Sequence, residues 1–180
     1  MKPLRPRYAK IQALVRQLLI GNDVRSAPVP IVRIAHGAGA IVQYHQFNKE
    51  ISGVLVREPG RAVIGVESNQ PETRQRFTIA HELGHFLLHE GDQVHVDRQF
   101  RLNYRSAKSS TAEDVEEIEA NAFAAAILMP ERLLRVDAGR LQFDIEDEEA
   151  VRELAIRYNV STQAMAIRLL NMVSMRRVLI

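Results

Sequence analysis

The sequence FTIAHELGHFLLH, residues 77–89, decides how the rest of this chain is interpreted. It contains the pattern His-Glu-x-x-His, formed by His81, Glu82 and His85. Side chains four residues apart lie on one face of a helix, so both imidazoles can direct a nitrogen at the same ion. Glu82 lies beside them, where its carboxylate can act as a general base without binding the metal. The stretch therefore predicts a helix that carries two metal ligands.

A third ligand has to come from a histidine or a carboxylate, because the 180-residue chain has no cysteine. His89 is the nearest candidate, four residues beyond His85. On a continuous helix, however, it lies about 12 Å along the axis from His81. Three side chains spread over that length cannot all reach one zinc ion at about 2.0–2.1 Å. We therefore expect His89 to support the site, or the helix, without binding the metal.

The acidic first half of the next predicted helix is a better source. Its glutamates are Glu113, Glu116, Glu117 and Glu119. Glu117 and Asn121 are four residues apart and share a face, so Glu117 can bind the metal while Asn121 hydrogen-bonds the outer nitrogen of a ligating histidine. Glu119 faces nearly the opposite way, and the acids that do not bind metal are expected on a solvated face. Glu113 and Glu116 share part of the Glu117 face and stay open as alternatives.

Two histidines and one carboxylate leave a fourth position open, which is typical of catalytic zinc. The pattern thus predicts one Zn²⁺ per chain and hydrolysis of a peptide bond, with Glu82 taking a proton and passing it to the leaving amine. The reaction also needs a donor for the developing oxyanion. Residues 91–110 are polar and are expected to form an irregular flap beside the cleft. Its candidate donors are His95, Tyr104 and Arg105, among which the sequence does not choose.

The remaining periodicity predicts an α+β fold. Short runs rich in apolar and β-branched residues at 31–35, 40–47, 51–57 and 62–66 predict a small, mostly antiparallel sheet. Helical patterns cover residues 9–20, 71–90, 110–129, 131–136, 146–158 and 161–172. Asn69 and Ser110 are the expected N-caps of the two ligand helices. Gly84, inside the first of them, costs about 1 kcal/mol relative to alanine and would allow another backbone to come close.

We divide the chain into a domain of residues 1–137 and a C-terminal helical subdomain of residues 138–180 packed on it. The short link at residues 158–161 resembles the break of a helix-turn-helix. The second helix of this pair offers only Arg168 before Arg176 and Arg177, whereas a recognition helix presents several basic or polar groups. The sequence therefore argues against direct binding of nucleic acid.

Composition and charge narrow the class of protein further. With 46% hydrophobic residues the chain can form one substantial core, and the absence of cysteine fits a cytoplasmic location. No stretch reaches the roughly 18 consecutive apolar residues that a membrane span needs. Residues 1–66 hold ten Lys and Arg against three Asp and Glu, a net charge of +7, and the rest of the chain carries −5. A solvated basic surface explains this asymmetry better than a partner does.

Three segments resemble the ImmA/IrrE family of metallopeptidases. They are Ile51-Ser52-Gly53, residues 76–89 with the His-Glu-x-x-His pattern, and residues 119–130, EANAFAAAILMP. The resemblance implies a minimal, thermolysin-like zincin fold, with an active-site helix and a second ligand helix. Carried over by position, it also implies His81, His85 and Glu117 as zinc ligands and Glu82 as the catalytic base.

The resemblance further implies a regulatory role for the chain. Members of the family cleave a helix-turn-helix repressor in mobile-element or stress-response control, and others resemble toxins of toxin–antitoxin pairs. The leading hypothesis is therefore a zinc-dependent endopeptidase with one regulatory protein, of helix-turn-helix repressor type, as its substrate. The alternatives are a toxin neutralised by a helix-turn-helix antitoxin, and a DNA-binding regulator.

Overall fold

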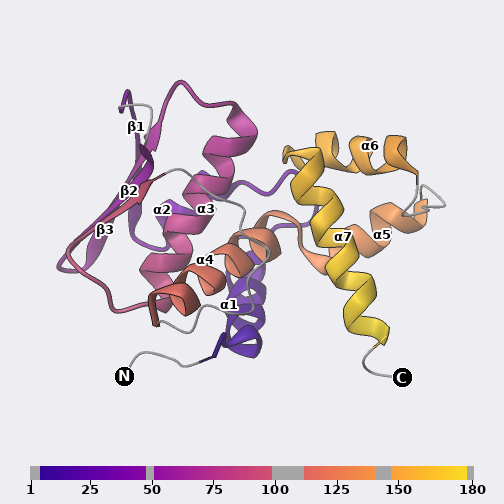
Figure 1. Cartoon of the computed structure of the whole chain (residues 1–180), viewed down its shortest axis with the longest axis horizontal. Coiled ribbons are helices and arrows are strands. Elements are labelled where there is room, and N and C mark those ends of the chain that lie inside the picture. Colours follow the sequence, from indigo (N-terminus) through magenta and orange to yellow (C-terminus); the bar gives the residue numbers. More distant parts are fainter. Residues whose placement is uncertain (1–4, 48–50, 99–111, 141–146, 178–180) are drawn as a thin grey trace.

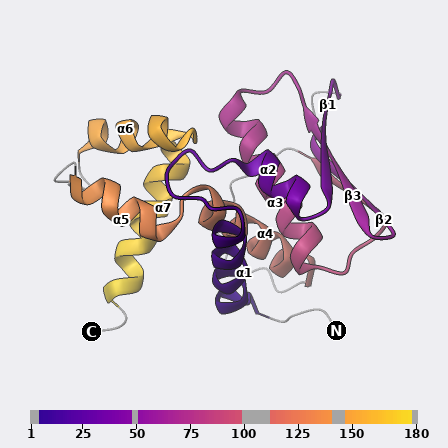
Figure 2. The same ribbon diagram turned by 180° about the vertical axis from the view of Figure 1, so that it is seen from behind.

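The computed structural model describes residues 5–47, 51–98, 112–140 and 147–177. Their elements follow the chain in the order α1 (Tyr8–Gly21), α2 (Ile31–Gly37), β1 (Ala40–His45), β2 (Ile51–Glu58), β3 (Arg61–Glu67), α3 (Glu72–Leu88), β4 (Val94–Arg98), α4 (Ala112–Leu128), α5 (Glu131–Arg140), α6 (Glu148–Tyr158) and α7 (Thr162–Arg177). The sheet stands at one end of the molecule and α5, α6 and α7 at the other, with α3 and α4 between them (Figures 1 and 2). The predicted α+β class is confirmed, and the arrangement is compatible with a minimal zincin-like fold.

The sheet has the strand order β1-β3-β2-β4 within the described residues. The β2–β3 and β2–β4 pairs are antiparallel, whereas β1 runs parallel to β3. The sheet is therefore mixed, though mostly antiparallel as predicted. Gly60 ends the tight turn between β2 and β3 with a positive φ of 78°, a conformation that glycine adopts without strain.

Two strand predictions need correction. Residues 31–35 form helix α2 and no strand, because Ile31, Ile34 and Ala35 have helical spacing and turn one buried face to the core. A run of five residues, four of them apolar, did not distinguish a short helix from a strand. The fourth strand is β4 instead, so the first part of the expected irregular flap is regular structure.

Helix α3 begins at Glu72, after an N-cap at Pro71. The expected cap, Asn69, instead donates its backbone N–H to Glu67 at 2.8 Å. The other expected cap, Ser110, lies outside the described residues. A Cβ placed on Gly84 would stand 3.2 Å from the Cα of Ala120, so the predicted close approach of a second backbone is confirmed, and that backbone belongs to α4.

The C-terminal helices connect to the rest of the chain through a few polar contacts and an apolar core. Asn159 ends α6 with a positive φ of 50°, before α7 begins at Thr162. The buried Tyr158 hydroxyl donates to Asp137 of α5 at 2.8 Å, and Arg76 of α3 donates to the Asn159 carbonyl at 3.2 Å. The division of the chain after residue 137 stays a prediction. None of the helices in the described part of the chain is long and apolar enough to cross a membrane.

Candidate metal centre

The three side chains of the His-Glu-x-x-His pattern lie on the buried face of α3. His81 and Glu82 are fully buried, and His85 is 3% exposed. The helix can bury this polar face because α4 crosses it closely at Gly84 and the sheet covers the other side. Burial of this kind is costly for polar groups unless they have partners or bind a ligand.

The two imidazoles and one carboxylate converge. The Nε2 atoms of His81 and His85 are 3.0 Å apart. The Glu117 carboxylate, from α4, lies 3.4 Å from the first of these nitrogens and 3.1 Å from the second. Its side chain is 44% exposed, so the cluster is open to solvent. The structure thus brings together the three predicted ligands, in a geometry that one ion of the size of zinc can bridge.

The outer nitrogens of both histidines also have partners. His81 Nδ1 lies 3.1 Å from Asn121 Oδ1, one turn of α4 beyond Glu117, as the shared-face argument predicts. Since an amide oxygen only accepts, His81 donates from Nδ1 and keeps the Nε2 lone pair for a metal. His85 Nδ1 lies 3.2 Å from His89 Nδ1, so His89 contacts a predicted ligand and stays outside the cluster itself.

The expectation of a solvated face for the other acids is wrong for Glu119. This residue has no exposed surface, and its carboxylate can be buried because it accepts hydrogen bonds from Arg7 and His89. Burial raises the pKa of Glu119, but these hydrogen bonds outweigh it and lower the pKa to about 2. Of the two alternative ligands, Glu116 is not among the groups of converging ligand atoms in the described residues. The side chain of Glu113 lies outside the described residues.

Glu82 has both carboxylate oxygens buried without a hydrogen-bond partner in the described part of the chain. Burial raises the pKa of Glu82 to about 8. An unpartnered carboxylate in such a place is uncommon in native proteins and indicates a functional group or a bound species. Burial lowers the pKa of His85 to about 3, which favours the neutral, ligating form of the imidazole.

Strand β4 adds two polar residues to the cluster. His95 Nε2 lies 3.7 Å from Glu117 Oε1, and its ring is 4.3 Å from that of His85. Asp97 approaches His81 and Glu82 closely enough to form a second group of potential ligands. Of the three candidate oxyanion donors, His95 therefore lies at the cluster, whereas Tyr104 and Arg105 lie outside the described residues.

Asp97 and Arg57 are site residues that the sequence reasoning missed. In β4 the polar His95 and Asp97 alternate with Val94 and Val96, which are 51% and 40% exposed. This alternation, with polar residues inward, is a signal of strand structure that the sequence did contain. Arg57 donates to the carbonyls of His85 at 3.1 Å and Asp92 at 2.8 Å, and so joins α3 to the start of β4. No local pattern marks that role.

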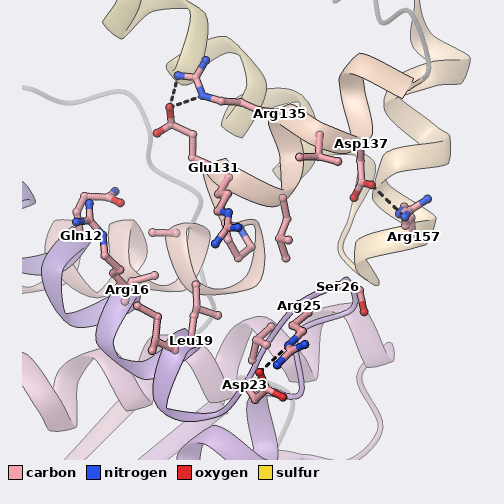
Figure 3. Close-up of a pocket in the computed structure, with 18 residues that line it drawn as sticks. Gln12, Arg16, Leu19, Asp23, Arg25, Ser26, Glu131, Arg135, Asp137 and Arg157 are labelled. Atoms are coloured by element: carbon pink, nitrogen blue, oxygen red, sulfur yellow. Dashed lines mark hydrogen bonds and ion pairs between the residues drawn. The ribbon is translucent and has the colours of Figure 1, made fainter.

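A large cavity lies elsewhere, between α1, the segment after it, and α5 (Figure 3). Its volume is about 1300 Å³, and none of the predicted ligands lines it. Its three acidic residues pair with arginines: Asp23 with Arg25, Glu131 with Arg135, and Asp137 with Arg157. This cavity is therefore separate from the cluster of metal-ligating side chains.

Comparison with known proteins agrees with the geometry. The family model described as the IrrE N-terminal-like domain matches residues 35–170. The radiation response metalloprotease IrrE of Deinococcus radiodurans is 36% identical over 107 residues, which cover 59% of this chain and 30% of that protein. A Mycobacterium tuberculosis transcriptional regulator has a similar fold, with a TM-score of 0.54 and 16% identity, over 87% of this chain and 45% of its own. The present chain thus spans less than half the length of either relative.

The match over residues 35–170 includes every predicted ligand, the predicted base and both ligand helices. The family is that of a metalloprotease domain, so a metal ion is expected, and the described residues offer the converging ligand atoms of His81, His85, His95 and Glu117 for it. The chain belongs to the IrrE N-terminal-like family of domains.

Proposed function

We propose that this domain is a zinc-dependent endopeptidase. The observation that carries the proposal is the buried, unpartnered carboxylate of Glu82 beside the converging nitrogens of His81 and His85 and the carboxylate of Glu117. A purely structural metal site needs no such free base, whereas hydrolysis does.

The donor set fits zinc. Two neutral imidazoles and one carboxylate are the ligands of many catalytic zinc sites, and they leave a position for substrate. His81, His85 and Glu117 would hold the ion. When bound there, zinc supplies a Lewis acid that polarises the scissile carbonyl.

Glu82 is the proposed proton carrier. Its free oxygens accept a proton from the attacking water, and the same carboxyl then donates it to the nitrogen of the leaving amine. Asn121 holds His81 through its outer nitrogen. His95 reaches the cluster from β4 and is our candidate for the donor that stabilises the oxyanion.

We further propose a single regulatory protein of helix-turn-helix repressor type as the substrate, in mobile-element or stress-response control. Family membership supports this, and one relative is named a radiation response metalloprotease. The output that competes with proteolysis is toxicity neutralised by a helix-turn-helix antitoxin.

The experiment is a cleavage assay with purified chain and a helix-turn-helix repressor encoded beside it. Glu82→Gln is expected to keep zinc and to lose cleavage, by 100-fold or more, on the order of a general-base contribution. Glu90→Gln changes an exposed glutamate beyond α3 and serves as the matched control. Cleavage that survives Glu82→Gln with zinc bound would refute the peptidase. Zinc content unaltered in Glu117→Ala would show that Glu117 is not the third ligand and would refute the site of His81, His85 and Glu117.

A further inference from the structure

The N-terminal segment is connected to the metal centre by hydrogen bonds that run through α4 and the end of α3. Arg7, the residue before α1, places three donors on the carboxylate of Glu119. Its backbone N–H donates to Oε1 at 2.5 Å, its Nε to Oε1 at 2.9 Å and its Nη2 to Oε2 at 2.6 Å. The same Nη2 donates to the Leu88 carbonyl at 3.1 Å, at the end of α3. Arg7 and Glu119 are 112 residues apart in the sequence.

Glu119 carries the chain of contacts onward. The carboxylate is fully buried, and its Oε2 also lies 3.0 Å from His89 Nε2. A charged carboxylate offers no proton, so His89 must donate from Nε2. A neutral His89 then has its lone pair at Nδ1.

The last contact reaches a predicted ligand. His89 Nδ1 lies 3.2 Å from His85 Nδ1. If His89 accepts there, His85 donates from Nδ1 and has its lone pair at Nε2, the atom that faces His81 and Glu117. Each hydrogen bond thus decides the tautomer of the next imidazole, and the series ends with the metal-binding nitrogen in the form that binds metal.

We propose that Arg7, Glu119 and His89 are positioning residues that hold His85 in its ligating tautomer and orientation, so that the N-terminal segment sets the metal affinity of the centre. The inference rests on the proposed metal site of His81, His85 and Glu117. It does not depend on the substrate or on peptidase activity. None of the three positioning residues touches the reacting atoms.

Direct measurement of metal binding by the full chain tests the proposal. Zn²⁺ affinity is measured by competition with a chromophoric chelator in Arg7→Ala and in Glu119→Gln, which has nearly the same shape as the natural side chain. We expect the dissociation constant to rise about 10-fold in the first variant and about 10- to 100-fold in the second, the range for groups that orient metal-binding histidines. Arg5→Ala, at an exposed arginine two residues earlier, is the matched control and should bind as the natural chain does.

Two spectroscopic readouts separate positioning from a general loss of structure. Nitrogen-15 NMR of the Zn²⁺-loaded protein should show His85 protonated at Nδ1 with that proton hydrogen-bonded to His89, and this signal should shift in Glu119→Gln. The visible spectrum of the Co²⁺-substituted chain should change in both variants, while the far-UV circular dichroism at the assay temperature stays that of the natural chain. Arg7→Ala leaves the buried Glu119 carboxylate with fewer donors, so its thermal midpoint should fall while the chain stays folded at that temperature.

These measurements distinguish a failure of the positioning role from a failure of the proposed metal site. If the natural chain binds no Zn²⁺, or Glu117→Ala binds it equally well, the metal site itself is wrong. If the natural chain binds Zn²⁺ through Glu117 but both positioning variants keep its affinity, its cobalt spectrum and its His85 NMR signal, only the positioning role is refuted.

Discussion

Gly53 of β2 lies directly against Glu82 of α3: a Cβ built on Gly53 would stand 3.1 Å from Glu82 Oε1 and 2.5 Å from Thr78 Cγ2. Glycine weakens the interior of a strand, so its presence there calls for a reason. The close approach of strand and helix supplies one. β2 forms the wall behind the proposed base, and only a residue without a side chain fits between them.

Replacing Gly53 by alanine should therefore damage both stability and activity. The 2.5 Å contact is too short to persist, so Thr78 or the strand must shift, at a cost of roughly 1–3 kcal/mol typical of overpacking. Thermal unfolding and the cleavage rate measure the two effects. Gly21→Ala is the control, because a Cβ at Gly21 meets nothing within 4 Å and the residue ends a helix. Equal stability of the two variants would contradict the packing argument.

The contact between Asn121 and His81 makes a separate prediction. Asn121→Ala removes the acceptor 3.1 Å from His81 Nδ1, and the imidazole loses its fixed orientation. We expect Zn²⁺ affinity to fall by about 10- to 100-fold, measured by chelator competition. Asn121→Asp retains an acceptor oxygen and should keep most of the affinity. A full loss of affinity in Asn121→Asp as well would show that the amide group matters for another reason.

These two contacts show what the sequence could predict about the site. The positions of His81, Glu82 and His85 follow from spacing along one helix, and Glu117 and Asn121 are related by the same rule on another. Such relations are local, so they can be predicted from the sequence without knowledge of the fold. The choice among three glutamates was open from spacing alone, and it depends on how α3 and α4 cross at Gly84.

Sequence reasoning missed two kinds of feature. One is contacts between segments far apart in the sequence, and the other is a short segment that fits two secondary structures equally well. Residues 31–35 fit a strand or a short helix equally well, and packing of Ile31 and Ile34 in the core decides for the helix. β4 pairs with β2, although β3 and α3 lie between these two strands in the sequence. The residues next to His95 and Asp97 therefore do not indicate that these two side chains face the cluster. The contact of Arg7 with Glu119 joins distant segments and has no sequence signal.

Metal binding should stabilise the folded chain. A ligand at about 100 times its dissociation constant adds about 2.7 kcal/mol, and each kcal/mol raises the midpoint of a domain of this size by about 2–4 °C. We therefore expect Zn²⁺ to raise the thermal midpoint by about 5–10 °C over protein treated with a chelator. Glu82→Gln should keep this increase, since Glu82 is not a proposed ligand, and Glu117→Ala should lose it. An increase that survives Glu117→Ala would place the stabilising ion elsewhere.

The final prediction tests how the C-terminal helices join the rest. Tyr158, on α6, donates to Asp137, on α5, and both are buried. Tyr158→Phe leaves the ring in place and removes the donor, while Arg157 still reaches Asp137 at 3.0 Å. The remaining ion pair limits the loss to about 1–2 kcal/mol, in the range for a buried hydrogen bond. Calorimetry should show a single transition at a midpoint lower by about 2–8 °C.

The control for this change is Tyr44→Phe, at a tyrosine that is 50% exposed and should alter the free energy of unfolding by less than about 0.5 kcal/mol. If residues 138–180 pack on the first domain as predicted from the sequence, Tyr158→Phe lowers the midpoint of the whole molecule, because the two parts unfold together. A lower-temperature transition that splits off in Tyr158→Phe, with the main midpoint unchanged, would show instead that α6 and α7 melt by themselves. The contact of Tyr158 with Asp137 would then stabilise the C-terminal helices without coupling their unfolding to that of the rest of the chain.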